Sequence, residues 1–88
     1  MKIKLGEPST DIDYIKLNST PMNVNDHQTV QGVPKGSTIF YDNKSRYIYV
    51  VGPEDFLRIQ AFSSNPDGSF GDKVYEWSFY KSKWVRIF

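Results

Sequence analysis

The feature of this sequence that most restricts its fold is a residue bias against helix. The 88 residues contain one alanine and three leucines, against seven isoleucines, seven valines and fourteen aromatic residues. Branched and aromatic side chains fit the pleated, half-buried surface of a sheet, and they lose rotamer freedom in a helix. The sequence therefore predicts an all-β fold with little helix.

Turn residues recur at short intervals and divide the chain into short segments. Glycine, proline, asparagine and aspartate cluster at residues 6–8, 32–36, 42–43, 52–55 and 65–68. Short strands at such spacing are typical of antiparallel sandwiches and barrels. A chain of this length supports one hydrophobic core. We therefore expect a single small domain over residues 1–88, an antiparallel sandwich or barrel of about five to seven short strands.

Strand patterns are clearest after residue 37, where thirteen of the fourteen aromatic residues lie. Residues 47–51 are apolar on both faces, which predicts a central strand. Residues 56–62 alternate apolar side chains with Arg58 and Gln60, which predicts one face in water. Trp77 shares its face with other aromatic residues and is expected in the core. The full set of expected strands is 38–41, 47–51, 56–62, 74–80 and 84–88.

Residues 18–36 are polar and rich in turn residues, and they predict a long loop or extended arm with at most one short strand. Loops of this length in small domains are usually functional or disordered. Prolines within the arm limit its freedom and lower the cost of ordering it on a partner. We expect the arm to contact a partner, with a mobile loop without a role as the alternative. The candidate contact residues are Met22, Val24, Val30 and Val33.

Charge is balanced over the whole chain but not along it. Eleven basic residues face ten acidic ones, which is too even for a general polyanion binder. Residues 73–88 carry four cations and one carboxylate among tryptophans and tyrosines, a pattern that suits single-stranded nucleic acid. The alternative is that the rings are core and that the lysines keep a sheet edge soluble. Trp84 and Arg86 share a strand face here and are further candidate partner-binding residues.

Little in the sequence points to catalysis, a cofactor or a metal. There is no cysteine, and the single histidine, His27, lies in the polar arm, where we interpret it as a surface residue. Asp11 and Asp13 form a short acid pair, but nothing nearby supplies the further oxygen ligands that magnesium requires. We interpret these acids as solvated turn residues. We expect no enzymatic activity, no cofactor and no metal site.

Two segments share a pattern with a known group of proteins. Residues 34–50 run from a Gly-Ser pair through an apolar strand and a polar turn to a Tyr-x-Tyr strand, and residues 83–87 form a Trp-Val strand. Together they resemble small β modules of bacteriophage virion proteins of the head-fibre, decoration or tail-fibre-tip type. The resemblance implies a structural or assembly role in a symmetric particle. It also implies synthesis in the host cytoplasm, location in the virion, and neighbouring copies or other virion proteins as partners.

Two other functions remain open. One is a small phage-type inhibitor or adaptor that binds a host protein. The other, less favoured, is a β-barrel that binds single-stranded nucleic acid. No stretch has the length of a membrane span, and the first residues lack the hydrophobic region of a signal peptide, so we expect no membrane partner.

Overall fold

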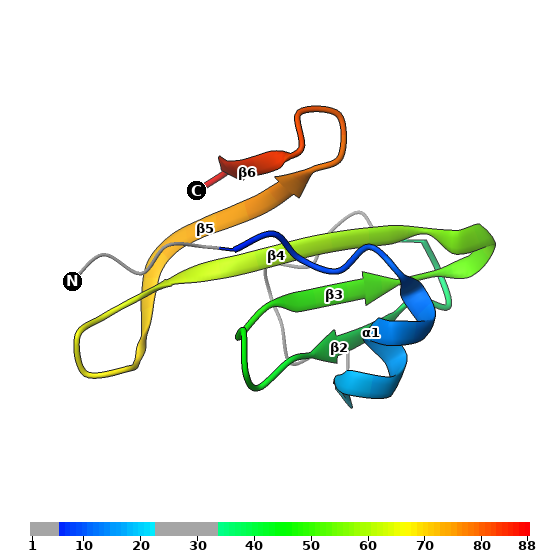
Figure 1. Cartoon of the computed structure of the whole chain (residues 1–88), viewed down its shortest axis with the longest axis horizontal. Helices are drawn as coiled ribbons and strands as arrows, with labels where there is room; N and C mark the ends of the chain where they lie inside the picture. Colours follow the sequence, from blue (N-terminus) through cyan, green and yellow to red (C-terminus); the bar gives the residue numbers. More distant parts are fainter. Residues whose placement is uncertain (1–5, 23–33) are drawn as a thin grey trace.

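The computed structural model describes residues 6–22 and 34–88 of the chain. Within these residues, six strands form one sheet in which every strand runs antiparallel to its neighbours, in the order β1-β2-β3-β4-β5-β6 (Figure 1). The predicted all-β class and the predicted number of strands are confirmed. The strands are β1 (Thr20–Met22), β2 (Thr38–Tyr41), β3 (Ile48–Val51), β4 (Leu57–Ser64), β5 (Phe70–Ser78) and β6 (Lys83–Arg86).

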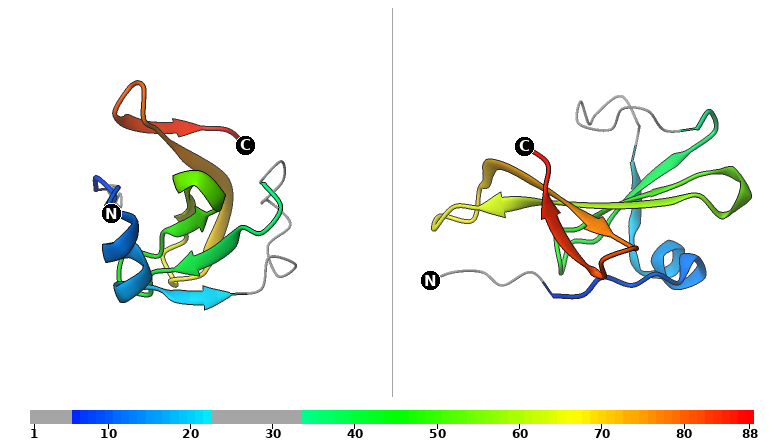
Figure 2. Two further views of the ribbon diagram at one scale, coloured as in Figure 1. Left: turned by 90° about the vertical axis from the view of Figure 1, so that its right-hand side faces the viewer. Right: turned by 90° about the horizontal axis from the view of Figure 1, so that it is seen from above.

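The sheet is a single open layer rather than two packed sheets or a closed barrel. It curls, so that the helix α1 (Ile12–Asn18) and the chain that leads into it lie on the concave side (Figure 2). We call residues 6–11 the N-terminal strap. The helix and the strap take the place of a second sheet, because they cover apolar side chains that would otherwise face water. β1 and β6 lie at the two edges of the sheet in the part of the chain that the structure describes.

The helix α1 was not among the expected elements, and its start explains the acid pair. A carboxylate oxygen of Asp11 accepts hydrogen bonds from the backbone N–H groups of Asp13, at 3.0 Å, and Tyr14, at 3.3 Å. This arrangement is an N-cap, which pairs donors that the first turn of a helix leaves free. Asp11 is therefore a structural cap rather than only a solvated turn acid. Ile15 turns inward and is buried, whereas Leu17 is 85% exposed.

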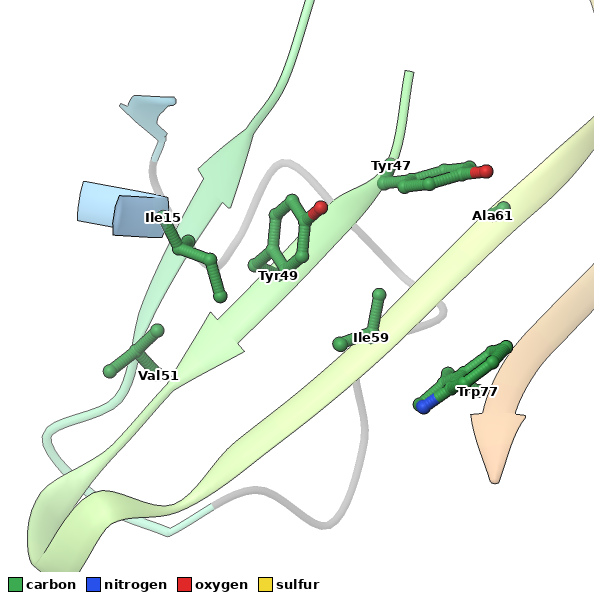
Figure 3. Packing of buried hydrophobic residues seen from close by; sticks show 7 residues of the cluster. All are labelled: Ile15, Tyr47, Tyr49, Val51, Ile59, Ala61 and Trp77. Atoms are coloured by element: carbon green, nitrogen blue, oxygen red, sulfur yellow. The ribbon is translucent and has the colours of Figure 1, made fainter. Parts of the chain in front are cut away.

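Two apolar clusters lie on opposite faces of the sheet, and β3 contributes to both. On the concave face, side chains from β3, β4 and β5 pack with Ile15 of the helix (Figure 3). Trp77 belongs to this cluster, as predicted. On the other face, Ile39, Ile48 and Val50 are buried together. All four residues of β3 are buried, which confirms the predicted central strand. The concave cluster consists of Ile15, Tyr47, Tyr49, Val51, Ile59, Ala61 and Trp77.

One residue of β4 contradicts the predicted wet face. Gln60 is only 2% exposed, although it alternates with apolar residues as expected. Its side-chain N–H group donates to a carboxylate oxygen of Glu76 on β5 at 3.4 Å, while its Oε1 has no hydrogen-bond partner. Arg58, also on this face, is partly buried and forms an ion pair with Glu76 at 3.3 Å. The prediction was wrong for Gln60 because strand alternation gives the face of a residue but not what covers that face.

The polar turns fall where the sequence predicts them. In the β2–β3 turn, a carboxylate oxygen of Asp42 accepts from the backbone N–H groups of Lys44, at 2.9 Å, and Ser45, at 3.4 Å. The β4–β5 turn is closed by a hydrogen bond from the Gly68 N–H group to the Asn65 carbonyl at 2.9 Å. Gly68 has a φ of +88°, a conformation that glycine adopts without strain. The turn at η2 (Pro53–Asp55) joins β3 to β4.

The end of the chain is held to the sheet, although β6 is shorter than expected. The strand ends at Arg86 rather than at the last residue. Beyond it, the backbone N–H group of Ile87 donates to the Val74 carbonyl at 2.9 Å, and the Val74 N–H group donates to the Phe88 carbonyl at 3.2 Å. The side chains of Ile87 and Phe88 are nevertheless exposed.

Candidate functional site

One hollow in the described part of the chain is a cleft of about 540 Å³ between the N-terminal strap, the first turn of α1 and the β2–β3 turn. We call it the acidic cleft. Its walls carry carboxylates and phenols that come from distant parts of the sequence. The side chains that give the cleft this character are Glu7, Asp11, Asp42, Tyr14, Tyr47 and Tyr49.

The strap is held over the aromatic side chains by one backbone carbonyl. The Gly6 carbonyl accepts from the Tyr47 hydroxyl at 2.7 Å and from the Trp84 Nε1–H group at 3.0 Å. The rings of these two residues lie 4.9 Å apart, and the Trp84 ring lies 5.5 Å from that of Trp77. Pro8, further along the strap, is buried. Tyr47, which also lines the acidic cleft, is therefore tied to the strap.

Burial and charge keep the two inner phenols of the cleft protonated. Burial, followed by the nearby Asp42 carboxylate, raises the pKa of Tyr49 to about 12. Burial, with a smaller contribution from the Asp42 carboxylate, also raises the pKa of Tyr47. A phenol with a raised pKa donates hydrogen bonds and is a poor base near neutral pH. Tyr47 and Tyr49 therefore suit binding rather than proton abstraction.

The carboxylates of the cleft differ in the hydrogen bonds that they accept from the backbone. Asp11 caps the helix and Asp42 holds the β2–β3 turn, so each uses one oxygen on backbone N–H groups. Glu7 is exposed. Among the described residues, no three acidic, histidine or cysteine side chains are grouped to hold a metal ion. The cleft has the chemistry to receive a cationic group, through charge and phenolic hydroxyls.

The second unusual surface is the turn and end of the β5–β6 hairpin. Of the six large apolar side chains exposed in the described residues, four belong to this hairpin. Tyr80, in the turn, is 96% exposed. Lys81 and Lys83 beside it are also exposed. We call residues 79–83 the hairpin tip. The four exposed apolar residues are Phe79, Tyr80, Ile87 and Phe88.

The residues predicted to bind a partner are placed unevenly. Met22 lies in β1 and packs, half-buried, against the cluster around Ile39. Trp84 is half-buried in the aromatic cluster, whereas Arg86, two residues along the same strand, is exposed and donates from Nε to the Phe88 carbonyl at 3.2 Å. The structure thus brings Trp84 and Arg86 together and places Met22 at the opposite edge. Val24, Val30, Val33 and His27 lie outside the described residues.

Sequence reasoning missed both the acidic cleft and the hairpin tip. Nothing in the sequence places Glu7, Asp11 and Asp42 together, because strap, helix and turn meet only through the tertiary fold. The sequence of the hairpin tip does indicate that one of its rings is exposed. Phe79 and Tyr80 are adjacent, and neighbours in a strand point to opposite faces, so both cannot enter one core. Strand alternation alone would place Phe79 on the same face as Trp77, but Phe79 lies beyond the end of β5 and is half-exposed.

Within residues 6–22 and 34–88, the structure has no helix with the length and hydropathy that a membrane crossing requires. No protein-family model matches the chain, and no curated protein or solved structure matches it.

Proposed function

We propose that the chain is a non-enzymatic bacteriophage virion structural or assembly protein that acts through protein–protein contacts in a symmetric particle. The observation that carries the proposal is the exposure of four large apolar side chains at the two ends of β6: Phe79 and Tyr80 in the turn before it, and Ile87 and Phe88 after it. The resemblance of residues 34–50 and 83–87 to small virion β modules is the reason for proposing that the partner is a virion.

Exposed aromatic residues on a rigid hairpin have a physical use in contacts between proteins. Single exposed apolar residues are common, but several on one element mark an interaction surface. Rings are enriched at the centres of protein interfaces, where they bury a large area at a low cost in rotamer freedom. Backbone hydrogen bonds to Val74 hold Ile87 and Phe88 in place, so little ordering is needed when a partner docks.

Binding of single-stranded nucleic acid is the second candidate, and exposed Tyr80 beside Lys81 and Lys83 favours it. Bases stack on exposed rings while cations follow the phosphates. However, Trp77 and Trp84 are packed against each other, at 5.5 Å between ring centroids, and do not offer free faces. The two exposed rings in the turn, Phe79 and Tyr80, make a small platform, which ranks this candidate below protein contact. If the chain is instead an inhibitor or adaptor, the same exposed residues of this chain would contact a host protein.

The proposal is tested on phage particles purified from a host that makes the chain. We expect the wild-type chain in the particles at a fixed ratio to the other virion proteins, measured by quantitative mass spectrometry. Replacing both Phe79 and Tyr80 with serine should lower that ratio. Leu17→Ser is the matched control, because Leu17 is equally apolar and 85% exposed but lies on α1. Thermal unfolding of all three proteins shows whether any loss reflects folding.

Two outcomes overturn the proposal. One is absence of the wild-type chain from purified particles. The other is incorporation of the double serine variant at the wild-type ratio. Binding to a fluorescent thymidine oligonucleotide that falls steeply with added salt would instead support the nucleic-acid candidate.

A further inference from the structure

We infer that the chain associates head to tail, with the hairpin tip of one copy seated in the acidic cleft of the next. This inference rests on the proposed function, since it takes the hairpin to be a protein-contact surface. It adds two things to the proposed function. One partner is a second copy of this chain, and the surface that receives the hairpin is the acidic cleft.

The two surfaces have opposite charge. The cleft presents Glu7, Asp11 and Asp42, whereas the tip presents Lys81 and Lys83 with no acidic residue among residues 79–83. Complementary potentials raise the rate of encounter and set the register between partners. The formal charge of the whole chain is only +1, so copies do not strongly repel one another.

The hairpin tip and the acidic cleft are also compatible in the space available and in the side chains that they present. The cleft, of about 540 Å³, is open to solvent, so side chains of a second copy can enter it. Tyr80 extends an almost fully exposed ring from the tip, and the half-exposed ring of Tyr14 lines the cleft. Aromatic pairs add attraction beyond the area that they bury. A lysine that enters beside the ring would meet the cleft carboxylates.

Contact of a hairpin with its own copy in a two-fold dimer is less favourable. Antiparallel pairing of β6 with β6 of a second copy would place Lys83 near Arg86, and like charges across neighbouring strands are destabilising. The tip does not fill its own cleft either, since Tyr80 is 96% exposed. Two different surfaces joined between copies make a heterologous contact, which closes into a ring or grows into a filament.

A charge-swap experiment on the full chain tests the inference. The tip variant carries Lys81→Glu and Lys83→Glu. The cleft variant carries Glu7→Lys and Asp42→Asn, where asparagine keeps an oxygen to accept the turn hydrogen bonds. The control variant, Lys16→Glu with Lys35→Glu, makes the same change in charge as the tip variant, at two exposed lysines away from the tip. Association is measured by sedimentation equilibrium over a range of protein concentrations, with thermal unfolding as the check on folding.

We expect concentration-dependent association of the wild-type chain that weakens as salt is added. The tip variant and the cleft variant should each associate about tenfold or more weakly, since close charge pairs dominate such contacts. An equimolar mixture of the two should recover association, because the unchanged tip of the cleft variant then meets the unchanged cleft of the tip variant. The control variant should behave as wild type.

Three results overturn the inference: a wild-type chain that stays monomeric at millimolar concentration, a cleft variant that associates as wild type, or a mixture that does not recover. The second result would indicate contact between hairpins alone. A monomeric chain that is still found at a fixed ratio in particles would overturn head-to-tail association and leave the proposed function standing. A chain that self-associates but is absent from particles would overturn the proposed function and leave head-to-tail association standing.

Discussion

Tyr49 connects the core of the molecule with the chemistry of the acidic cleft. Its ring packs in the concave cluster, and its side chain also lines the cleft, near Asp42. Ionising this phenol would place a second negative charge in a partly desolvated site, which is why its pKa rises to about 12. The folded state therefore favours the neutral phenol more than the unfolded chain does.

This difference predicts a loss of stability at high pH. The pKa of Tyr49 is higher in the folded chain than in the unfolded chain, where it is about 10. Its contribution to the free energy of unfolding is then fully present below pH 10 and is lost as pH rises through about 12. Urea unfolding between pH 9 and 12 measures the decline. Tyr49→Phe should show a smaller decline, and an equal decline in this variant would contradict the assignment.

Gln60 is the residue at which burial and polarity conflict. Its Oε1 is buried without a partner, and a buried group of this kind costs about 1–3 kcal/mol. Leucine has a similar size and no polar atoms, so Gln60→Leu should leave stability unchanged or raise it by about 1 kcal/mol. Gln60→Glu should destabilise, because it places a buried carboxylate beside Glu76. Chemical denaturation of the three proteins gives the order, and a clear loss in the leucine variant would show that the amide is needed.

At the scale of elements, α1 depends on its cap more than on its own helical tendency. Seven residues are too few for an independent helix in water, so tertiary packing and capping must hold it. Ile15 supplies the packing, and the Asp11 carboxylate supplies the cap. The same carboxylate lines the acidic cleft, which makes the start of this helix both structural and part of the candidate site.

Asp11→Ala should lower the free energy of unfolding by about 0.5–2 kcal/mol, the usual cost of removing an N-cap. Asp11→Asn keeps the accepting oxygen and should recover most of the loss. Asp13→Ala is the control, since Asp13 is exposed in the first turn and its side chain is not the cap. Circular dichroism and denaturant unfolding report both effects. Equal losses at Asp11 and Asp13 would argue against the cap.

The elements also show what the sequence could and could not predict. The 38–51 hairpin was predictable because its alternation, turn residues and doubly apolar strand all agree. The helix was not, because one buried face with Ile12 and Ile15 is too short to establish a helical period. The acidic cleft was out of reach for a different reason: it depends on the strap crossing the sheet, and that crossing is set by hydrogen bonds from distant residues to one glycine carbonyl.

At the scale of the whole molecule, the strap connects parts of the chain that are far apart in sequence. The Gly6 carbonyl is hydrogen-bonded to side chains of Tyr47, next to β3, and Trp84, on β6. These bonds hold the cover of the concave face to two parts of an open sheet. They also help to fix the wall of the cleft against the hairpin that carries the exposed aromatic residues.

Trp84→Phe tests this link by removing the Nε1–H donor, and it also shortens the ring that packs against Tyr47 and Trp77. We expect a loss of about 0.5–1.5 kcal/mol in the free energy of unfolding for the hydrogen bond, and a further loss for the smaller ring. Hydrogen exchange should also become faster at backbone N–H groups of the strap. Arg86→Ala, on the same strand but exposed, is the control. Unchanged exchange in the strap would show that Tyr47 alone holds it.

The hydrogen bond from Trp84 to Gly6 joins residues 78 positions apart in the chain. During synthesis, residues leave the ribosome in order, so the segment around Gly6 emerges long before the strand to which it will be tied. The aromatic surface beneath it must stay incompletely covered until the residues up to Trp84 have been made. Closing so large a loop is slow compared with forming a hairpin. Resistance to proteases should therefore appear in one late step, after β6 has been made, rather than gradually along the chain.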